Sequence, residues 1–313
     1  MKRFKAAVPA GLSSFFAICD LDEEGRPISN PLMVGAIGGG FKLSPPIRTE
    51  VVIEEADAPS FVIFINGRQE EAPTSTIVVR ELIRKAGQPP VKIKVYHSID
   101  QPIAAGFGTS GCGAVTLTAA LSKALGVNMT LVEIGQLAHM AEVKARTGLG
   151  TVGAVITAGA CMITKRPGAP GYGLVDSIPM DLKGLKMVVA YFGPLPTKSI
   201  LARPEIREQV NRAGWRALHR ILKDPTPERL LEESLNFAKE SRLMTENIKK
   251  AIEVIADIKG IVGFAQNMLG DALHILVEED RAPELKERLS SLSNCRKVLC
   301  YDLDDSGLRV FQS

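Results

Sequence analysis

The order of hydrophobic and polar positions predicts strands in the first third of the chain and helices in the last third. Residues 61–65 are an apolar run that ends at Asn66-Gly67, a pair typical of a two-residue hairpin turn. Residues 91–96 alternate apolar and polar side chains, as a half-buried strand does. From residue 204 to about residue 257, Leu, Ile and Ala recur every three or four positions among charged residues, which indicates helices. Strands followed by helices are typical of an α+β protein.

The middle of the chain contains two further predicted helices and a predicted strand. The alanine-rich segment 114–125 is followed by Gly126, which predicts a helix with a glycine at its end. Thr130 and Glu133 have the spacing of a capping box, which predicts a second helix over about 131–146. Residues 152–164 are rich in β-branched side chains and predict a strand. Further short strands are predicted at 187–192, 296–301 and 308–311.

Length and composition limit the classes of protein. The chain has 313 residues, enough for two domains, which we expect over 1–185 and 186–313. Its net charge is +3 and its aromatic content is 5%, so we expect no nucleic-acid partner. The 5 cysteines and 4 histidines are scattered, which argues against structural zinc and against a disulfide framework. This favours a reducing, cytoplasmic location.

Two features are shared with exported or membrane proteins. The first 19 residues have a basic start, a mildly apolar middle and a cysteine, as a signal peptide does, but Pro9 and Gly11 interrupt the middle. Two uncharged runs, 101–122 and 147–164, are long enough to span a bilayer. Both runs are dense in Gly and Thr and poor in Leu, so we favour buried segments of a soluble core and expect no membrane association.

The segment that points most clearly to chemistry is the loop 102–113, with the sequence PIAAGFGTSGCG, directly before the alanine-rich helix. Small residues let a ligand approach the backbone closely, and successive N–H groups at a helix N-terminus bind anions. The hydroxyls of Thr109 and Ser110 add a phosphate donor and a candidate magnesium ligand. These features together predict a phosphate-binding loop.

Three other interpretations of this loop are a Walker A loop, a dinucleotide-binding motif and a close packing of small residues. It has no lysine, so it is not a Walker A loop. Gly106, Gly108 and Gly111 match the spacing of a dinucleotide-binding motif, but no strand ends directly before Gly106, which disfavours an oxidoreductase. A close packing of small residues without any ligand is the structural alternative.

The loop resembles the phosphate loop of the GHMP kinases, the superfamily of galactokinase, homoserine kinase, mevalonate kinase and phosphomevalonate kinase. Other segments extend the resemblance over nearly the whole chain and make it narrower, toward the archaeal pantoate kinase family. They are VPAGLSSFF at 8–16, HMAEVKARTGLG at 139–150, KRPGAPGYG at 165–173 and GFAQNMLG at 263–270. The resemblance implies a two-domain GHMP kinase fold, with a ribosomal S5 domain 2-like N-terminal domain and a smaller α+β C-terminal domain.

The resemblance also implies roles for individual residues. Ser110 and Glu142 would hold Mg2+ and serve catalysis, and His139 and Ser13 would bind pantoate. From the residues alone, Glu142 could instead pair with Arg146 on the surface, and His139 could be a core-edge histidine. The implied ATP-binding residues are Gly106, Gly108, Thr109, Ser110, Gly111, Cys112, Gly113 and Thr197, of which Thr197 could instead be a helix N-cap.

Three departures from the family pattern affect the acceptor side. Thr151 stands where the family has a catalytic aspartate, and Gly11 stands where its N-terminal motif has histidine. The strand at 158–163 lacks the family's arginine, and Lys165 and Arg166 are the nearest cations. Because phosphoryl transfer depends mainly on positioning and charge neutralisation, these losses do not by themselves abolish kinase chemistry.

The resemblance as a whole implies a cytoplasmic, homodimeric kinase that uses ATP and Mg2+ to convert pantoate to 4-phosphopantoate on the route to coenzyme A. Because the departures lie on the acceptor side, two alternatives stay open. One is a GHMP kinase for another small hydroxy acid or alcohol. The other is a non-catalytic paralogue that binds nucleotide.

Overall fold

The computed structural model describes residues 2–87, 90–195, 203–268 and 270–312. The strands are β1 Lys2–Cys19, β2 Gly35–Glu55, β3 Ser60–Ile65, β4 Arg68–Gln69, β5 Val91–Ser98, β6 Cys161–Arg166, β7 Leu174–Ile178, β8 Leu185–Pro194, β9 Ile261–Gln266, β10 Gly270–Glu278, β11 Lys297–Leu303 and β12 Arg309–Gln312. The helices are α1 Pro73–Ala86, α2 Thr109–Ala124, α3 Leu131–Ala145, α4 Thr151–Ile156, α6 Pro204–Lys223, α7 Pro227–Glu240, α8 Glu246–Ile255 and α9 Ala282–Ser290, with the short 3-10 helix η1 Glu279–Arg281.

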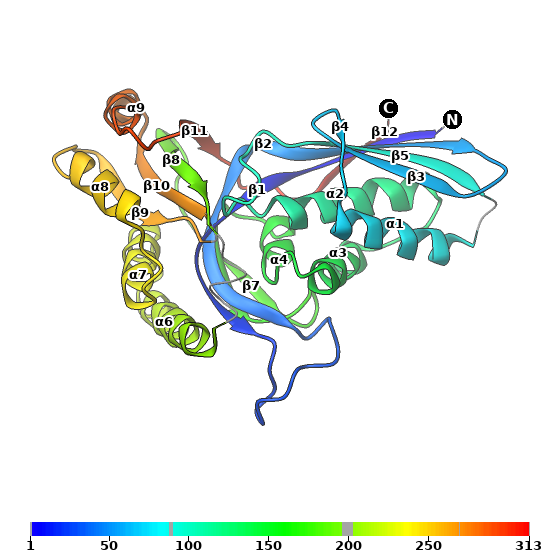
Figure 1. Ribbon diagram of the computed structural model, residues 1–313, viewed down its shortest axis with the longest axis horizontal. Helices are drawn as coiled ribbons and strands as arrows, with labels where there is room; N and C mark the ends of the chain where they lie inside the picture. The colour runs from blue at the N-terminus through cyan, green and yellow to red at the C-terminus, as the bar shows by residue number, and fades with distance from the viewer. Residues whose placement is uncertain (1, 88–89, 196–202, 269, 313) are drawn as a thin grey trace.

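The N-terminal part is a sheet with helices on one face. The long strands β1 and β2 form a curved antiparallel hairpin, β5 pairs with β2, and β3 runs parallel to β5. Helices α1 to α4 lie below this sheet in Figure 1, and none of the described helices covers its upper face. The register of β1 on β2 shifts between Val8 and Ala10 and again between Ser13 and Phe15. Bulges redirect the strand, and both lie in the segment 8–16 that resembles the N-terminal family motif.

The C-terminal part has its own sheet of β8, β10 and β9, covered by α8 and α9. Strand β11 is hydrogen-bonded to β8 and, through Asp302 and Leu303, also to β2. The described strands therefore form one hydrogen-bonded network of 12 strands. The last strand, β12, returns to pair with β1. The mixed architecture confirms the α+β prediction, whereas the division into domains 1–185 and 186–313 stays a prediction.

Several local predictions are confirmed. Asn66 and Gly67 both have positive φ, and Phe64 pairs with Gln69 across them, as in a two-residue hairpin. Helix α3 begins with the complete capping box of Thr130 and Glu133. The strands predicted near 91–96, 187–192, 296–301 and 308–311 correspond to β5, β8, β11 and β12.

One prediction is wrong in its first half. Residues 151–156 form helix α4, and the predicted strand begins only at Cys161 as β6. The β-branched residues Val152, Val155 and Ile156 recur at helical spacing and are all buried, so packing against the core outweighs their strand propensity. Helix α1, which starts at Pro73, was not predicted.

The two uncharged runs are buried parts of the protein. Residues 101–122 form the loop and most of α2, and 13 residues of that helix are buried. Residues 147–164 contain α4 and the start of β6. Among the residues described, no helix has the length and hydrophobicity that crossing a membrane requires. Burial therefore explains why the two runs lack charged residues.

Candidate active site

The glycine-rich loop has a backbone that only glycine tolerates at two points. Gly106 and Gly108 both have positive φ, and Gly108 is the N-cap of α2. A Cβ atom on Gly106 would lie 2.4 Å from the Met268 carbonyl oxygen, and one on Gly108 would lie 2.4 Å from Cγ2 of Thr151. The Gly108 cap makes no side-chain hydrogen bond to the first turn of α2. The loop therefore leads into the amino end of the 16-residue helix α2 with backbone N–H groups that no side chain at positions 106 and 108 covers. An anion site requires such free N–H groups.

Glu142 lies beside the start of α2. It projects from α3, is 1% exposed, and its Oε1 accepts a 2.7 Å hydrogen bond from Oγ of Ser110. Oε2 is buried and has no hydrogen-bond partner among the residues that the structure describes. A Cβ atom on Gly111 would lie 2.7 Å from Oε2, and one on Gly148 would lie 2.5 Å from Oε1. The carboxylate is thus held between two glycines, and the interpretation of Glu142 as a surface partner of Arg146 is wrong.

Burial changes the acidity of this carboxyl group. It raises the pKa of Glu142 to about 7, and the hydrogen bond from Ser110 acts in the opposite direction with a smaller effect. A partnerless oxygen on a buried carboxylate is costly unless a cation or a donor reaches it. The arrangement therefore favours a positively charged ligand between Glu142 and Ser110.

This pKa leads to a prediction for the metal-free protein. Because the folded pKa is above the unfolded one, Glu142 stabilises the fold below about pH 4.5, and this contribution is lost as the pH rises through about 7. The loss corresponds to about 3 kcal/mol of unfolding free energy. Urea unfolding from pH 4.5 to 8 of the wild type and of Glu142→Gln measures it.

The comparison with Glu142→Gln is needed because buried histidines act in the opposite direction. Burial lowers the pKa of His97 to about 4 and that of His274 to about 3, so they favour the folded state as the pH rises toward their unfolded value. Both variants share this contribution, and the difference between them isolates Glu142. Parallel pH profiles for the two proteins would contradict the prediction.

Thr151 and Gly11 are neighbours at this site. Thr151 is the first residue of α4, and a Cβ atom on Gly11 would lie 3.4 Å from its Cγ2 and 2.9 Å from Cγ1 of Val155. The helix therefore occupies the space that a side chain at position 11 would need. The two departures from the family pattern are spatially coupled, since a histidine at Gly11 would require α4 to move.

The two residues predicted to bind the acceptor lie in different surroundings. Ser13 is half-buried on β1, and its N–H donates a 3.1 Å hydrogen bond to the Gly106 carbonyl, so it adjoins the loop. His139 is 1% exposed on the same buried face of α3 as Glu142, and its Nε2 donates to the Val34 carbonyl at 2.8 Å. Burial lowers the pKa of His139. A contact between His139 and the acceptor substrate stays a prediction.

The remaining predicted ATP-binding residues either offer only backbone groups to a nucleotide or lie outside the described part of the chain. Cys112 is fully buried with its thiol toward the Pro9 carbonyl, and a Cβ atom on Gly113 would face His97. These two positions could serve a nucleotide only through the backbone. Thr109 is the first residue of α2. Thr197 lies outside the described residues.

The two basic side chains at the end of β6, Lys165 and Arg166, interact with neighbouring residues. Nζ of Lys165 lies 2.5 Å from Oδ2 of Asp176 on β7, and Nε of Arg166 donates to the Tyr172 carbonyl at 3.1 Å. A cation that sequence analysis did not single out, Lys42 on β2, is fully buried. Its Nζ donates to the carbonyls of Thr157, at the end of α4, and Ser306. Burial lowers the pKa of Lys42 to about 8. Lys42 therefore anchors the helix that carries Thr151.

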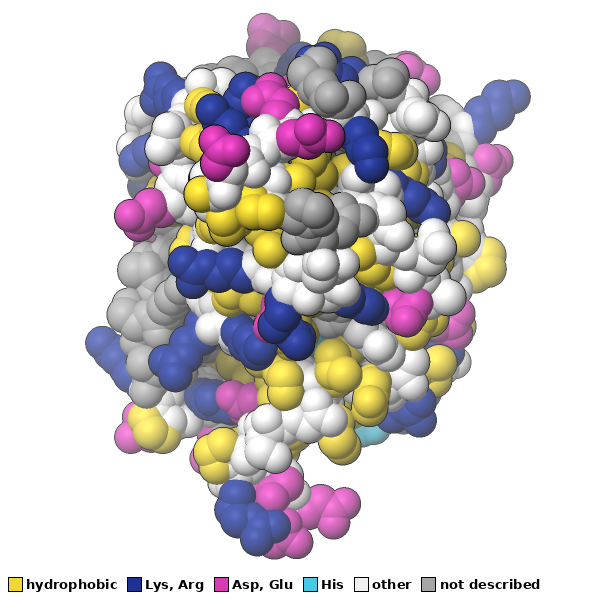
Figure 2. Space-filling model, turned by 90° about the vertical axis from the view of Figure 1, so that its right-hand side faces the viewer, with side chains coloured by type: hydrophobic (Ala, Val, Ile, Leu, Met, Phe, Trp, Pro, Cys, Tyr) yellow, Lys and Arg dark blue, Asp and Glu magenta, His cyan; other side chains and the backbone are white. Residues whose placement is uncertain are grey.

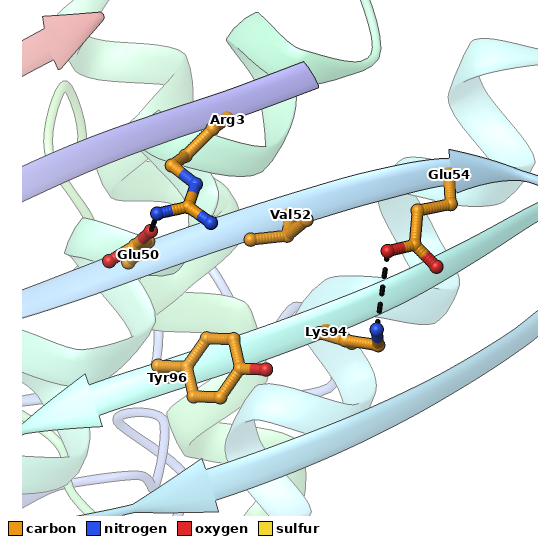
Figure 3. Close-up of a pocket in the computed structure, with 6 residues that line it drawn as sticks. All are labelled: Arg3, Glu50, Val52, Glu54, Lys94 and Tyr96. Carbon is orange, nitrogen blue, oxygen red and sulfur yellow. Dashed lines mark hydrogen bonds and ion pairs between the residues drawn. The ribbon is translucent and has the colours of Figure 1, made fainter. Parts of the chain in front are cut away.

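A hollow of about 420 Å³ lies on the outer face of the N-terminal sheet, on β1, β2 and β5. Figure 3 shows that its side chains project from the strands, with the helices behind the sheet. Arg3 pairs with Glu50 at 3.0 Å and Lys94 with Glu54 at 3.2 Å, so its charges are already compensated. Basic, acidic and apolar side chains are also interspersed on the face seen in Figure 2. The loop and Glu142 lie on the helical side and remain the candidate site.

Comparisons with known proteins agree with this geometry. The family model of the GHMP kinases N-terminal domain matches residues 74–161, which contain the loop, Glu142 and Thr151. The pantoate kinase of Thermococcus kodakarensis is 30% identical over 96% of this chain and 94% of its own length. The pantoate kinase of Methanocaldococcus jannaschii is 31% identical over 91% of this chain and 96% of its own length.

Solved structures show the same fold. A phosphotransferase related to the CoA biosynthesis pathway superposes with a TM-score of 0.86 and 28% identity, covering 99% of both chains. Mevalonate diphosphate decarboxylase from Enterococcus faecalis, at 16% identity, has a TM-score of 0.71 over 100% of this chain and 99% of its own. The latter shows the fold alone. Together with the family model over residues 74–161, this likeness confirms the predicted GHMP kinase fold. With relatives this similar over nearly its whole length, the chain belongs to the pantoate kinase family of the GHMP kinases.

Proposed function

We propose that the protein transfers the γ-phosphoryl group of ATP to the C4 hydroxyl of pantoate, with release of ADP. The observation that carries the proposal is the buried, partnerless oxygen of Glu142 next to Ser110 at the amino end of α2. Membership of a kinase family supports the use of ATP. The names of the relatives support pantoate as the acceptor.

The residues present fit a magnesium ion. Oε2 of Glu142 and Oγ of Ser110 are hard oxygen ligands, and Mg2+ usually keeps several waters, so two protein ligands suffice. Within the described ranges no cluster of three or more His, Cys, Asp or Glu side chains offers a different metal site. When bound, Mg2+ would neutralise charge on the β- and γ-phosphates.

The chain's own groups would divide the remaining tasks between the two substrates. The N–H groups of the loop and of the first turn of α2 would bind the phosphates, since the N-cap, Gly108, makes no side-chain hydrogen bond to that helix. Ser13 on β1, whose N–H donates to the Gly106 carbonyl of the loop, would orient the acceptor. Thr151 has no carboxylate with which to take the acceptor's proton, so catalysis would depend on positioning and charge neutralisation.

The direct test is a screen of ADP release with pantoate, homoserine and mevalonate as acceptors. We expect pantoate to give the highest kcat/KM, and phosphorus NMR to show a phosphomonoester on C4. ADP release that is faster with another acceptor would assign the chain to that acceptor instead. Nucleotide binding without turnover of any acceptor would favour the non-catalytic alternative, to which Thr151 in place of an aspartate lends some support.

We also propose a homodimer in the cytoplasm. The homodimer follows from the family resemblance, and light scattering coupled to gel filtration tests it. All cysteines are free in the structure, which is consistent with a reducing compartment.

A further inference from the structure

A buried chain of side-chain hydrogen bonds joins three segments that lie far apart in the sequence. Oγ of Ser14 on β1 lies 2.9 Å from Nε2 of His274 on β10. Nδ1 of His274 lies 2.8 Å from Oδ1 of Asn267, which follows β9. Nδ2 of Asn267 donates to the carbonyl of Ala105, at the start of the phosphate loop, at 3.0 Å. All three side chains are completely buried.

The directions of the three hydrogen bonds follow from the carbonyl of Ala105, at which the network ends. A backbone carbonyl only accepts, so Asn267 must turn its NH2 group toward Ala105 and its oxygen toward His274. His274 must therefore donate from Nδ1, and burial keeps the ring neutral because it lowers the pKa of His274 to about 3. Nε2 is then an acceptor, and Ser14 donates to it. Each of the three hydrogen bonds therefore joins one donor to one acceptor.

Backbone contacts connect the same three segments. The Ser13 N–H donates to the Gly106 carbonyl at 3.1 Å, and the Met268 N–H donates to the Ser13 carbonyl at 2.9 Å. A Cβ atom on Gly270, the first residue of β10, would lie 2.6 Å from the Ala105 carbonyl oxygen, so the described part of the turn between β9 and β10 is in close contact with the loop. The bulge at Ser13 and Ser14, the start of the loop and this turn thus form one unit.

We propose that His274 is a positioning residue that holds the start of the phosphate loop and the acceptor-side bulge of β1 in a fixed relation. The part of the proposal that concerns Ser13 and the acceptor rests on the proposed function. The part that concerns the phosphate loop and nucleotide binding, its nucleotide half, does not. Through Asn267 the imidazole fixes the carbonyl of Ala105, directly before the positive φ of Gly106. Through Ser14 it fixes the strand that carries Ser13. The C-terminal sheet thereby sets the geometry of both substrates.

A matched pair of serine variants separates positioning from stability. Ser75 on α1 donates to Nε2 of His97, which is also buried, at 3.0 Å, and Nδ1 of that ring also has a hydroxyl partner, Thr49. Ser14→Ala and Ser75→Ala therefore remove the same group from the same kind of acceptor. We expect similar decreases in Tm, because each leaves one buried ring nitrogen unsatisfied.

The readout is binding of a non-hydrolysable ATP analogue with Mg2+, measured by calorimetry, together with kcat. We expect Ser14→Ala to weaken analogue binding about five- to tenfold and to lower kcat, Ser14→Thr to restore both in part, and Ser75→Ala to leave both within about twofold. Equal effects of the two alanine variants, or wild-type binding by Ser14→Ala, would overturn the proposal.

Asn267→Asp tests the last contact without changing the shape of the side chain. The carboxylate still accepts from His274 but cannot donate to the Ala105 carbonyl, so we expect analogue binding to weaken at least about tenfold. Binding within twofold of wild type would overturn the role of this contact. If this variant does not fold, the serine pair still decides the matter. A wild-type protein that binds the analogue but does not phosphorylate pantoate would refute the proposed function and leave the nucleotide half standing.

Discussion

Replacing Glu142 by glutamine is expected to lower kcat by about a thousandfold while leaving the fold intact. A metal ion that neutralises transferring phosphate charge contributes several kcal/mol, and each ~1.4 kcal/mol is a factor of ten in rate. The amide keeps the size of the side chain between Gly111 and Gly148, so the loss follows from the missing charge. The measurement is kcat as a function of Mg2+ concentration.

Although Glu142→Gln should lose activity, it should not lose stability. The ionised Glu142 is buried above about pH 7 with one oxygen unpartnered, so removing its charge should not lower the Tm of the metal-free protein at pH 8. Glu133→Gln, on the first turn of the same helix, is the matched control because glutamine also completes a capping box. Wild-type turnover by Glu142→Gln, or an equal loss in Glu133→Gln, would refute the assignment of the metal site.

The features that the sequence predicts well are governed by neighbouring residues. The Asn66-Gly67 hairpin and the capping box of Thr130 and Glu133 each depend on a few consecutive positions, and both form as predicted. The loop was recognisable because its glycines and the helix behind it are contiguous. Placing Ser110 against Glu142 required the family resemblance, since 32 residues separate them.

The features that the sequence does not reveal arise from tertiary packing. Helix α4 has the composition of a strand, and only its burial against the N-terminal core explains the helix. Ser14 and His274 are 260 residues apart, and a lone histidine in an apolar strand carries no local signal. The pKa of Glu142 likewise depends on complete burial, whereas its spacing to Arg146 suggested an exposed ion pair.

Gly111→Ala is expected to lower kcat/KM by about a hundredfold, although alanine is the better helix former. Gly111 lies in the first turn of α2, where the substitution alone would favour the helix by about 1 kcal/mol. Its Cβ would lie 2.7 Å from Oε2 of Glu142 and 3.1 Å from Cβ of Thr151. The backbone of Gly148 lies on the other side of the carboxylate, where a Cβ atom would be 2.5 Å from Oε1, so we expect either Glu142 or α4 to shift. Displacements of about 1 Å in a catalytic group can cost about a hundredfold in rate.

Gly113→Ala, two residues further along the same helix, provides the comparison. Its Cβ would meet the His97 ring at 3.5 Å, an ordinary van der Waals contact on the side of α2 that faces away from Glu142. We expect this variant to gain slightly in Tm and to keep most of its activity, so that the two alanines have similar effects on helix propensity and opposite effects on catalysis. Thermal unfolding and steady-state kinetics of the pair measure both. Equal activity in the two variants would mean that the carboxylate is free to move, and that its position between Gly111 and Gly148 does not set the geometry of phosphoryl transfer.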